Sequence, residues 1–203
     1  NSRIPVIKHY KGVCNLFVDA SADLKKAQNS TVSSKCGRPG VCNAIENLIV
    51  EQSVAEQFLP SCAKDLTEKG CTLLGDERAR SILQDFEVSP AGDDDFHEEF
   101  LDLRLSIAVV NSIEQAIEFV NRFGSGHSES ILTAERARAE QFLNQVDASS
   151  VYWNASTRFT DGFEFGLGAE IGISTDRLHA RGPMGLEELC TYKYQIIGTG
   201  QWK

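Results

Sequence analysis

The first residue that could carry chemistry is the cysteine in "RPGVCNA", residues 38–44. Gly37, Pro39 and Gly40 predict an irregular loop before it, and Cys42 is expected to open a new element. At a helix start, unpaired backbone N–H groups and the helix dipole favour the thiolate form of a cysteine. The same N–H groups could stabilise an oxyanion at the carbon that the thiolate attacks. The segment therefore suggests a nucleophile, although buried cysteines with a purely structural role are common.

A glycine-rich stretch at residues 154–175, "NASTRFTDGFEFGLGAEIGIST", is the second candidate. Its Gly166-x-Gly168 is close to the dinucleotide-binding fingerprint but does not match it, because that fingerprint needs a hydrophobic strand before it and a helix after it. A turn-rich loop is the plainer interpretation. Three polar side chains beside an aromatic residue could nevertheless hold a small anion, since arginine offers a planar fork to a carboxylate. They are Ser156, Thr157 and Arg158.

The four histidines are weaker candidates: His9, His97, His127 and His179. A cysteine–histidine dyad is one arrangement that activates a thiol. Nothing in the sequence brings His127 of "GSGHS" near Cys42, however, and a hydrogen-bonded loop histidine is the commoner outcome. The sequence has no C-x-x-C motif and no His/Cys pair with zinc-finger spacing, so we expect no metal site.

Composition limits the classes of protein that these residues could serve. The chain has 203 residues, of which 41% are hydrophobic and 24% charged, as expected for a globular domain with a substantial core. The net charge of −9 argues against non-specific binding to nucleic acid or to an anionic membrane surface. No apolar run approaches the roughly 18 residues that a transmembrane helix needs.

The amino-terminal residues and the cysteines both favour a cytoplasmic protein. Residues 1–11 lack the apolar centre of a signal peptide, and "IPVIKH" reads as a strand entered midway. The six cysteines are an even number, which permits disulfides, but the chain is large enough to fold without them. We therefore expect reduced thiols and a cytoplasmic location.

Short apolar runs alternate with amphipathic runs along most of the chain. Strands are predicted at residues 13–18, 48–50, 71–74, 103–110, 128–132, 150–153 and 191–197. Helices are predicted at residues 22–36, 55–66, 76–84, 113–120 and 139–146. This alternation predicts an α/β domain with a largely parallel open sheet flanked by helices. The irregular stretch at 154–185 is too long for a simple connection, and such loops are usually functional.

Local signals refine two of these helices. Ser53 and Glu56 have the spacing of a capping box, as have Ser112 and Gln115, so each pair predicts a helix start. Pro60 lies inside the helix that follows Ser53. It should kink or split that helix, because its ring removes one backbone hydrogen bond and clashes with the preceding turn.

Five motifs resemble those of one enzyme family. They are "RPGVCNA" (38–44), "NRFGSGHSESILT" (121–133), "NASTRFTDG" (154–162), "EFGLGAEIGIST" (164–175) and "HARGPMGLEEL" (179–189). All are similar to segments of the gamma-glutamyl phosphate reductases, also called glutamate-5-semialdehyde dehydrogenases, of the aldehyde dehydrogenase superfamily. The resemblance covers nearly the whole chain and corresponds to the C-terminal catalytic half of the family enzymes.

The resemblance implies a reaction in proline biosynthesis. Family enzymes reduce L-glutamyl 5-phosphate to L-glutamate 5-semialdehyde with NADPH, through a thioester on a cysteine that Cys42 matches. A thioester accepts hydride far more readily than a carboxylate does, which explains the covalent intermediate. Two alternatives are another aldehyde dehydrogenase that acts on a different semialdehyde, and a domain with only a binding or assembly role.

The resemblance also assigns roles to further residues. Glu99 in "EEFLDL" matches the superfamily glutamate that holds the nicotinamide ribose, and a solvated acidic surface is the alternative. Ser156, Thr157 and Arg158 would contact the amino acid end of the substrate. Hydrolytic members of the superfamily carry a water-activating glutamate at the position that aligns with His9 here. Its absence fits a reductase better than a dehydrogenase that releases a free acid.

On the same grounds the chain divides into three parts. Residues 1–12 would end a cofactor-binding domain, residues 13–190 would form the catalytic domain, and residues 191–203 would form a C-terminal strand with a role in oligomerisation. The remainder of a cofactor-binding domain has no counterpart in this sequence, so we expect the chain alone to be inactive. A homo-oligomer and a functional link to glutamate kinase are further expectations.

Overall fold

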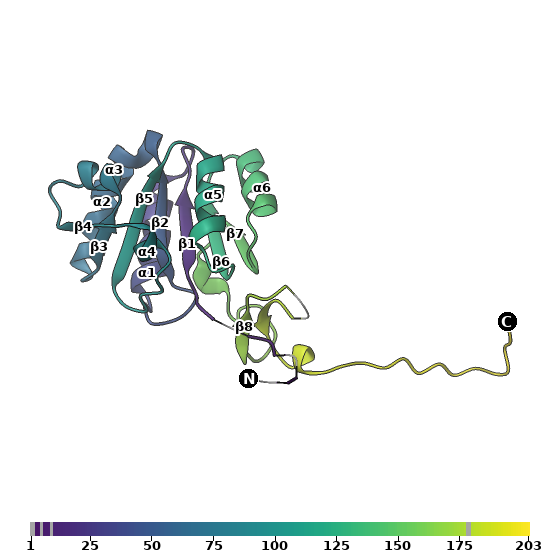
Figure 1. The fold of residues 1–203 in the computed structure, drawn as a ribbon. Helices are drawn as coiled ribbons and strands as arrows, with labels where there is room; N and C mark the ends of the chain where they lie inside the picture. The colour runs from purple at the N-terminus through teal and green to yellow at the C-terminus, as the bar shows by residue number, and fades with distance from the viewer. Residues whose placement is uncertain (1–2, 5, 9, 178–179) are drawn as a thin grey trace.

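A computed structural model describes residues 3–4, 6–8, 10–177 and 180–203. Within them, seven strands form one sheet in the order β4-β3-β5-β2-β1-β6-β7, and all neighbouring strands are parallel (Figure 1). The strands are β1 (Cys14–Val18), β2 (Ile45–Glu51), β3 (Thr72–Gly75), β4 (Val88–Pro90), β5 (Arg104–Val110), β6 (Ser128–Leu132) and β7 (Ser150–Trp153). The predicted α/β domain with a largely parallel open sheet is therefore confirmed.

Helices cover both faces of the sheet and give the domain three layers (Figure 1). The helices are α1 (Leu24–Cys36), α2 (Gln52–Glu68), α3 (Glu77–Ile82), α4 (Asp93–Phe96), α5 (Ile113–Phe123) and α6 (Arg136–Gln145). Successive side chains of β1 point to opposite faces of the sheet, because a strand is pleated, and so they pack against different helix layers. Leu16 and Val18 pack in one buried cluster with residues of α1, α2 and α3, whereas Phe17 packs with α5 and α6.

Two of the local helix signals turn out differently from expectation. The prediction of a capping box at Ser53 is wrong, because α2 begins at Gln52 and has no side-chain cap. Pro60 does not split α2, which runs as one helix of 17 residues. Six apolar side chains of α2 are buried against the core, and this burial outweighs the one hydrogen bond that a proline removes. The helix start predicted at Ser112 is confirmed, since the Ser112 side chain accepts a hydrogen bond from Gln115 N–H.

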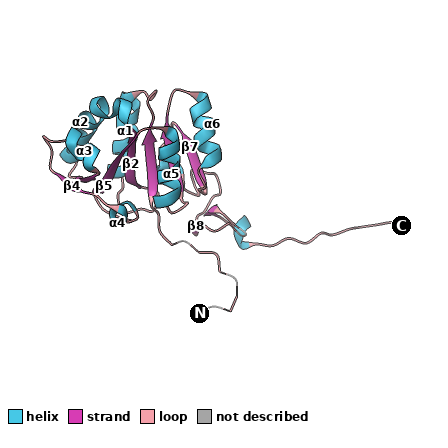
Figure 2. Cartoon of the chain, turned by 45° about the horizontal axis from the view of Figure 1, so that its top comes forward, coloured by secondary structure: helices cyan, strands magenta, loops and turns pink. Residues whose placement is uncertain are grey.

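After β7 the chain forms small elements rather than a further layer. They are η1 (Thr157–Phe159), β8 (Gly172–Ser174), β9 (Gly182–Met184), which pairs antiparallel with β8, and η2 (Glu187–Leu189). The strand expected at 191–197 is not formed. Those residues are exposed and lie outside regular secondary structure, and the tail runs away from the body (Figure 2). A strand needs another strand edge to pair with, and no described strand of this chain is hydrogen-bonded to the tail.

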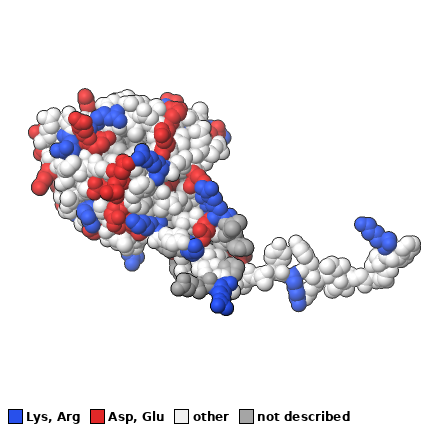
Figure 3. Space-filling view, viewed as in Figure 1, with Lys and Arg blue, Asp and Glu red and all other residues white. Residues whose placement is uncertain are grey.

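Charges of both signs are intermixed on the face of the body that Figure 3 shows, so this face carries no extended basic surface. Asp and Glu outnumber Lys and Arg, 29 to 20. Among the described residues, no helix is long and apolar enough to cross a lipid bilayer.

Candidate active site

Cys42 lies in the loop between α1 and β2, in a turn closed by a 3.0 Å hydrogen bond from Ala44 N–H to the Val41 carbonyl. The element that follows is the buried strand β2, so the expectation of a helix start at Cys42 is wrong. The helix dipole and the free N–H groups invoked from the sequence are therefore not available to this thiol. Cys42 instead stands at the amino end of a central strand of the sheet.

The start of β1 and the residues just before it contact the Cys42 peptide. Gly12 approaches it so closely that a Cβ atom there would lie 2.1 Å from the Cys42 carbonyl oxygen. Cys14, fully buried at the start of β1, donates its S–H to the same oxygen at 3.2 Å. Gly12, which precedes β1, and Cys14, its first residue, thus fix the backbone from which the Cys42 side chain extends.

Asn43 holds the other side of the loop to the turn that contains η1. Its Nδ2 donates to the Thr160 carbonyl at 2.9 Å, and its Oδ1 accepts a hydrogen bond from the Arg158 guanidinium. The Asn43 carbonyl accepts a 2.7 Å hydrogen bond from the Thr157 hydroxyl. These contacts bring two motifs more than 100 residues apart into one site. The sequence analysis missed Asn43, although its amide stands directly beside the candidate nucleophile in "RPGVCNA".

The three residues expected to bind an anion divide between two roles. Ser156 and Arg158 line a cavity of about 340 Å³ together with Glu164. Thr157 is fully buried and its hydroxyl is engaged by the Asn43 carbonyl, so it supports the loop rather than lining the cavity. The cavity therefore offers a guanidinium, a carboxylate and a hydroxyl within one space.

The Cys42 thiol keeps its proton at neutral pH in this arrangement. Burial raises the pKa of Cys42 to about 11, and the carboxylates of Glu170 and Glu99 act in the same direction. The residue's own backbone N–H and the Arg158 guanidinium oppose this rise in pKa. The expected thiolate is thus not stabilised by the described residues alone, because burial and then the charges of two carboxylates disfavour it.

Glu99, which the family resemblance predicts to be a ribose contact, lies near Cys42. It lies in the segment between α4 and β5, is partly exposed, and is close enough to act on the charge of Cys42. A partly exposed carboxylate near the candidate nucleophile can accept hydrogen bonds from the hydroxyls of a ribose. Gly166 and Gly168 lie in the loop before β8 rather than between a strand and a helix, so this stretch forms no dinucleotide cradle.

His127 is close to the site after all. It is fully buried just before β6, where its Nδ1 lies 3.5 Å from Cys14 Sγ and 2.8 Å from Ser128 Oγ. Cys14 therefore stands between His127 and the Cys42 carbonyl, which is a supporting arrangement and not a catalytic dyad. His9 and His179 lie outside the described residues, within which no group of His, Cys, Asp and Glu has the geometry of a metal site.

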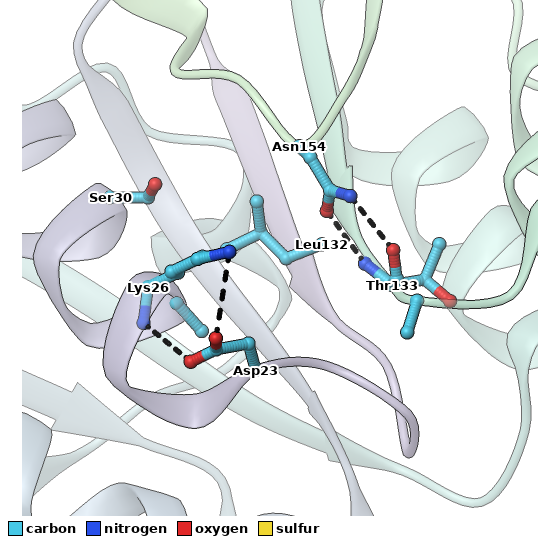
Figure 4. Close-up of a pocket in the computed structure, with 8 residues that line it drawn as sticks. Asp23, Lys26, Ser30, Leu132, Thr133 and Asn154 are labelled. Atoms are coloured by element: carbon cyan, nitrogen blue, oxygen red, sulfur yellow. Dashed lines mark hydrogen bonds and ion pairs between the residues drawn. The ribbon is translucent and has the colours of Figure 1, made fainter.

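A second cavity, of about 300 Å³, opens at the opposite, carboxyl end of the sheet (Figure 4). Asn154 and Thr133 form one side of it, where the Asn154 amide bonds both the N–H and the carbonyl of Thr133. Lys26 and Asp23 of the α1 start form the other side. Ser156, Arg158 and the Cys42 loop do not line this cavity, which separates it from the candidate active site.

Comparison with known proteins identifies close relatives. A sequence model of the aldehyde dehydrogenase family matches residues 97–193. "Gamma-glutamyl phosphate reductase" of Persephonella marina is 56% identical over 98% of this chain, and that of Moorella thermoacetica is 55% identical over 99%. The chain spans about half the length of these relatives, 46% and 48% respectively.

Solved structures of proteins with the same name are also similar to this chain. The crystal structure of gamma-glutamyl phosphate reductase from Thermotoga maritima matches 100% of this chain and 49% of its own, with a TM-score of 0.95 and 48% identity. The Saccharomyces cerevisiae protein of the same name matches 81% of this chain and 41% of its own, with a TM-score of 0.61 and 31% identity. Lactaldehyde dehydrogenase from Escherichia coli, at 18% identity and a TM-score of 0.57, shares the fold.

Proposed function

Because this chain is homologous over nearly its whole length to about half of gamma-glutamyl phosphate reductase, we propose that it carries the nucleophile and part of the substrate site of that reductase. The reaction is the reduction of L-glutamyl 5-phosphate to L-glutamate 5-semialdehyde in proline biosynthesis. One observation supports this most directly. The Cys42 loop and the Arg158 turn, far apart in sequence, are joined through Asn43, and Arg158 in turn lines the cavity of about 340 Å³, which Cys42 itself does not line.

In the proposed reaction the Cys42 sulfur, after losing its proton, attacks the acyl carbon of the substrate. A C–S bond forms, the bond to the phosphate oxygen breaks, and inorganic phosphate leaves. Hydride addition to the thioester carbonyl and cleavage of the C–S bond then release the semialdehyde and return the Cys42 thiolate. NADPH, when bound, supplies that hydride.

Arg158 and Glu164 would orient the substrate. The substrate keeps the α-carboxylate and α-ammonium of an amino acid, and the cavity presents a guanidinium and a carboxylate that match these charges. Ser156 adds a hydroxyl to the same cavity, while the Thr157 hydroxyl donates a hydrogen bond to the Asn43 carbonyl and so supports the Cys42 loop. This match favours a substrate with the charged groups of an amino acid, whereas the alternative is an aldehyde dehydrogenase that acts on a different semialdehyde.

Glu99 would accept hydrogen bonds from the nicotinamide ribose, and this is the one cofactor contact that we assign to the chain. A single contact is far less than a dinucleotide needs for binding. We therefore expect that residues 1–12 end a cofactor-binding domain, that 13–190 form the catalytic domain, and that the isolated chain does not turn over.

The tail at 191–203 would join another copy of the protein. It exposes five large apolar side chains: Tyr192, Tyr194, Ile196, Ile197 and Trp202. Such a row is typical of a segment that another surface covers. A homo-oligomer, a cytoplasmic location and a functional link to glutamate kinase complete the proposal.

The first test uses the acyl-transfer half of the reaction, which needs no cofactor. The chain is incubated with an activated γ-ester of L-glutamate, and the labelled residue is located by mass spectrometry. We expect one glutamyl group on Cys42 and none in Cys42→Ser. Cys62→Ser, which alters a buried thiol in the core, should keep the label. A glutamyl group on another cysteine would overturn the assignment.

The second test uses a chimera in which this chain replaces the matching 49% of the Thermotoga maritima protein. We expect NADPH oxidation that depends on glutamyl phosphate, and loss of this activity in the Cys42→Ser chimera. The chain alone should show no turnover. A rate near about 1 s⁻¹ with the isolated chain, which is normal for an enzyme, would contradict the proposed division of the protein.

A further inference from the structure

Three hydroxyl groups form a row next to the turn that carries Arg158. The Thr160 hydroxyl, in the residue that follows η1, lies 2.5 Å from the hydroxyl of Ser128 at the start of β6 and 2.7 Å from that of Tyr152 in β7. Thr160 and Ser128 are fully buried, and Tyr152 is partly buried. A hydroxyl can donate one hydrogen bond and accept others, so Thr160, in the middle of the row, bonds to both neighbours at once.

The row continues from Ser128 to the loop that carries Cys42. The Ser128 hydroxyl lies 2.8 Å from His127 Nδ1, and the same nitrogen lies 3.5 Å from Cys14 Sγ. Cys14 in turn donates its S–H to the Cys42 carbonyl oxygen at 3.2 Å. His127 and Cys14 are fully buried. Hydrogen-bonded side chains thus connect the start of β6 to the backbone of the candidate nucleophile.

The backbone of Thr160 leads back to the same loop. Its carbonyl accepts a 2.9 Å hydrogen bond from Asn43 Nδ2, and Asn43 Oδ1 accepts one from the Arg158 guanidinium. Cys42 and Asn43 are consecutive residues, so these contacts close into a hydrogen-bonded ring. The ring consists of Cys42, Cys14, His127, Ser128, Thr160 and Asn43. Thr160 contributes twice, because its hydroxyl bonds to the sheet and its carbonyl holds the loop.

The polar character of this ring is better explained by positioning than by stability. Hydrogen-bonded hydroxyls in a core add little net stability, because folding exchanges their bonds to water for bonds within the protein. A buried network whose members are bonded to one another instead fixes the positions of the groups that it connects. Apolar side chains of similar size would fill the same space, but they would not hold the Cys42 loop and the Arg158 turn at a defined separation.

We propose that Thr160 is a positioning residue for acyl transfer, which sets the distance between the Cys42 sulfur and the Arg158 guanidinium. This inference rests on the proposed function, in which Arg158 holds the substrate carboxylate while the sulfur attacks the acyl carbon. Thr160 does not line the cavity that Arg158 lines, so it acts through Asn43. Without the Thr160 hydroxyl, the turn after η1 loses its bonds to Ser128 and Tyr152, and the Asn43 amide moves with the Thr160 carbonyl. A substrate held at Arg158 then presents its acyl carbon to a displaced sulfur.

The test compares two reactions of the same thiol in the 203-residue chain. Transfer of a glutamyl group from an activated γ-ester of L-glutamate requires a defined distance between Cys42 and Arg158. Alkylation of Cys42 by iodoacetamide, a small uncharged reagent, has no such requirement. Both reactions use the thiolate, so the ratio of their rates at one pH cancels any change in the pKa of Cys42.

Thr160→Val keeps the shape of the side chain and removes the hydroxyl. It should lower the ratio of glutamylation to alkylation by about 10- to 100-fold, because a displacement of about 1 Å at a reacting group costs about 100-fold in rate. Thr160→Ser retains the hydroxyl and should restore most of the ratio. Tyr152→Phe removes one of the two bonds to the Thr160 hydroxyl and should lower the ratio by about fivefold, which corresponds to the loss of one hydrogen bond. The alkylation rate of Cys42 should stay nearly unchanged throughout.

Thr31→Val is the matched control. Thr31 is also fully buried, and its hydroxyl donates a 2.8 Å hydrogen bond to the Ala27 carbonyl within α1, outside the ring. This variant should lower the Tm about as much as Thr160→Val does but leave the ratio unchanged.

Two results would overturn the proposal, and they are distinguishable. If the parent chain is glutamylated at Cys42 and folded Thr160→Val keeps the parent ratio, the role of Thr160 is wrong and the proposed function stands. If the parent chain takes no glutamyl group on Cys42, the proposed function fails and the role of Thr160 fails with it. Should Thr160→Val not fold, the ratio measured for Tyr152→Phe decides in the same way.

Discussion

The close approach of Gly12, just before β1, to the loop that carries Cys42 makes Gly12→Ala the most informative substitution. The added methyl carbon would lie 2.1 Å from the Cys42 carbonyl oxygen and 2.8 Å from both its carbonyl carbon and its Cα. Non-bonded carbon atoms prefer about 3.5 Å, so the Cys42 backbone has to move by roughly 1 Å. The neighbouring atoms are backbone, and no side-chain rotation can relieve the overlap.

Two quantities should change. Overpacking of this kind destabilises a domain by about 1–3 kcal/mol, which lowers the Tm by about 3–10 °C at this chain length. A shift of about 1 Å at a reacting group costs about 100-fold in rate, so turnover of the chimera should fall by that factor. The hydrogen bond that the Cys14 thiol donates to the Cys42 carbonyl oxygen, at 3.2 Å in this structure, should be lost at the same time.

Thermal unfolding of the chain and NADPH oxidation by the chimera measure these two effects. Gly172→Ala is the matched control, because a Cβ at Gly172 would meet only the end of the Met184 side chain, at an ordinary 3.7 Å. It should leave both quantities nearly unchanged. If the folded Gly12→Ala chimera keeps its turnover within about twofold of the parent, the reaction does not need the Cys42 peptide in the position that the contact with Gly12 imposes, and the reasoning fails.

Three further outcomes are expected. Lys35→Met, which removes the fully buried partner of Glu46, should cost about 3–5 kcal/mol near pH 8 in urea unfolding. Burial already raises the pKa of Glu46 to about 7 against the opposing effect of Lys35, so the variant should recover stability as the pH falls and the carboxyl takes up a proton; a loss that grows toward low pH would contradict this. Glu170→Gln should lower the pKa of Cys42 and speed its alkylation near pH 8 by about three- to tenfold, as peptide mapping should show, because one negative charge is removed. Arg158→Lys in the chimera should lower kcat/KM by about 10- to 150-fold, since a bidentate contact to a carboxylate is lost; an unchanged kcat/KM would exclude Arg158 from the substrate site.

Regular elements were predictable because their patterns are local. The strands predicted at 128–132 and 150–153 coincide with β6 and β7. The helix containing Pro60 was harder, since a local rule for proline competes with burial that only the sheet supplies. The tail at 191–197 has a strand-like composition, but strand formation depends on a partner edge that the sequence does not display.

Candidate site residues could be selected from the sequence by residue type. Which of them contact each other, and which are buried, could not be predicted. The residue types of Cys42 and Arg158 predicted a thiol nucleophile and an anion partner, whereas the ribose contact of Glu99 was implied only by the family resemblance. Thr157 was grouped with its neighbours because a sequence does not say which of three adjacent side chains points inward. The structure buries it completely, and its hydroxyl supports Asn43.

The sequence by itself determined the alternating α/β pattern and the set of reactive side chains, because hydrophobic period and residue type are properties of the chain. Only the tertiary structure decided what surrounds each of them. Parallel pairing of β1, β2 and β6 brings Gly12, Cys42 and His127 to the same end of the sheet. The protonation of Cys42 is likewise decided by burial and by carboxylates from distant segments. Such electrostatic effects act through space, so a thiol expected to ionise at a helix start instead holds its proton before a buried strand.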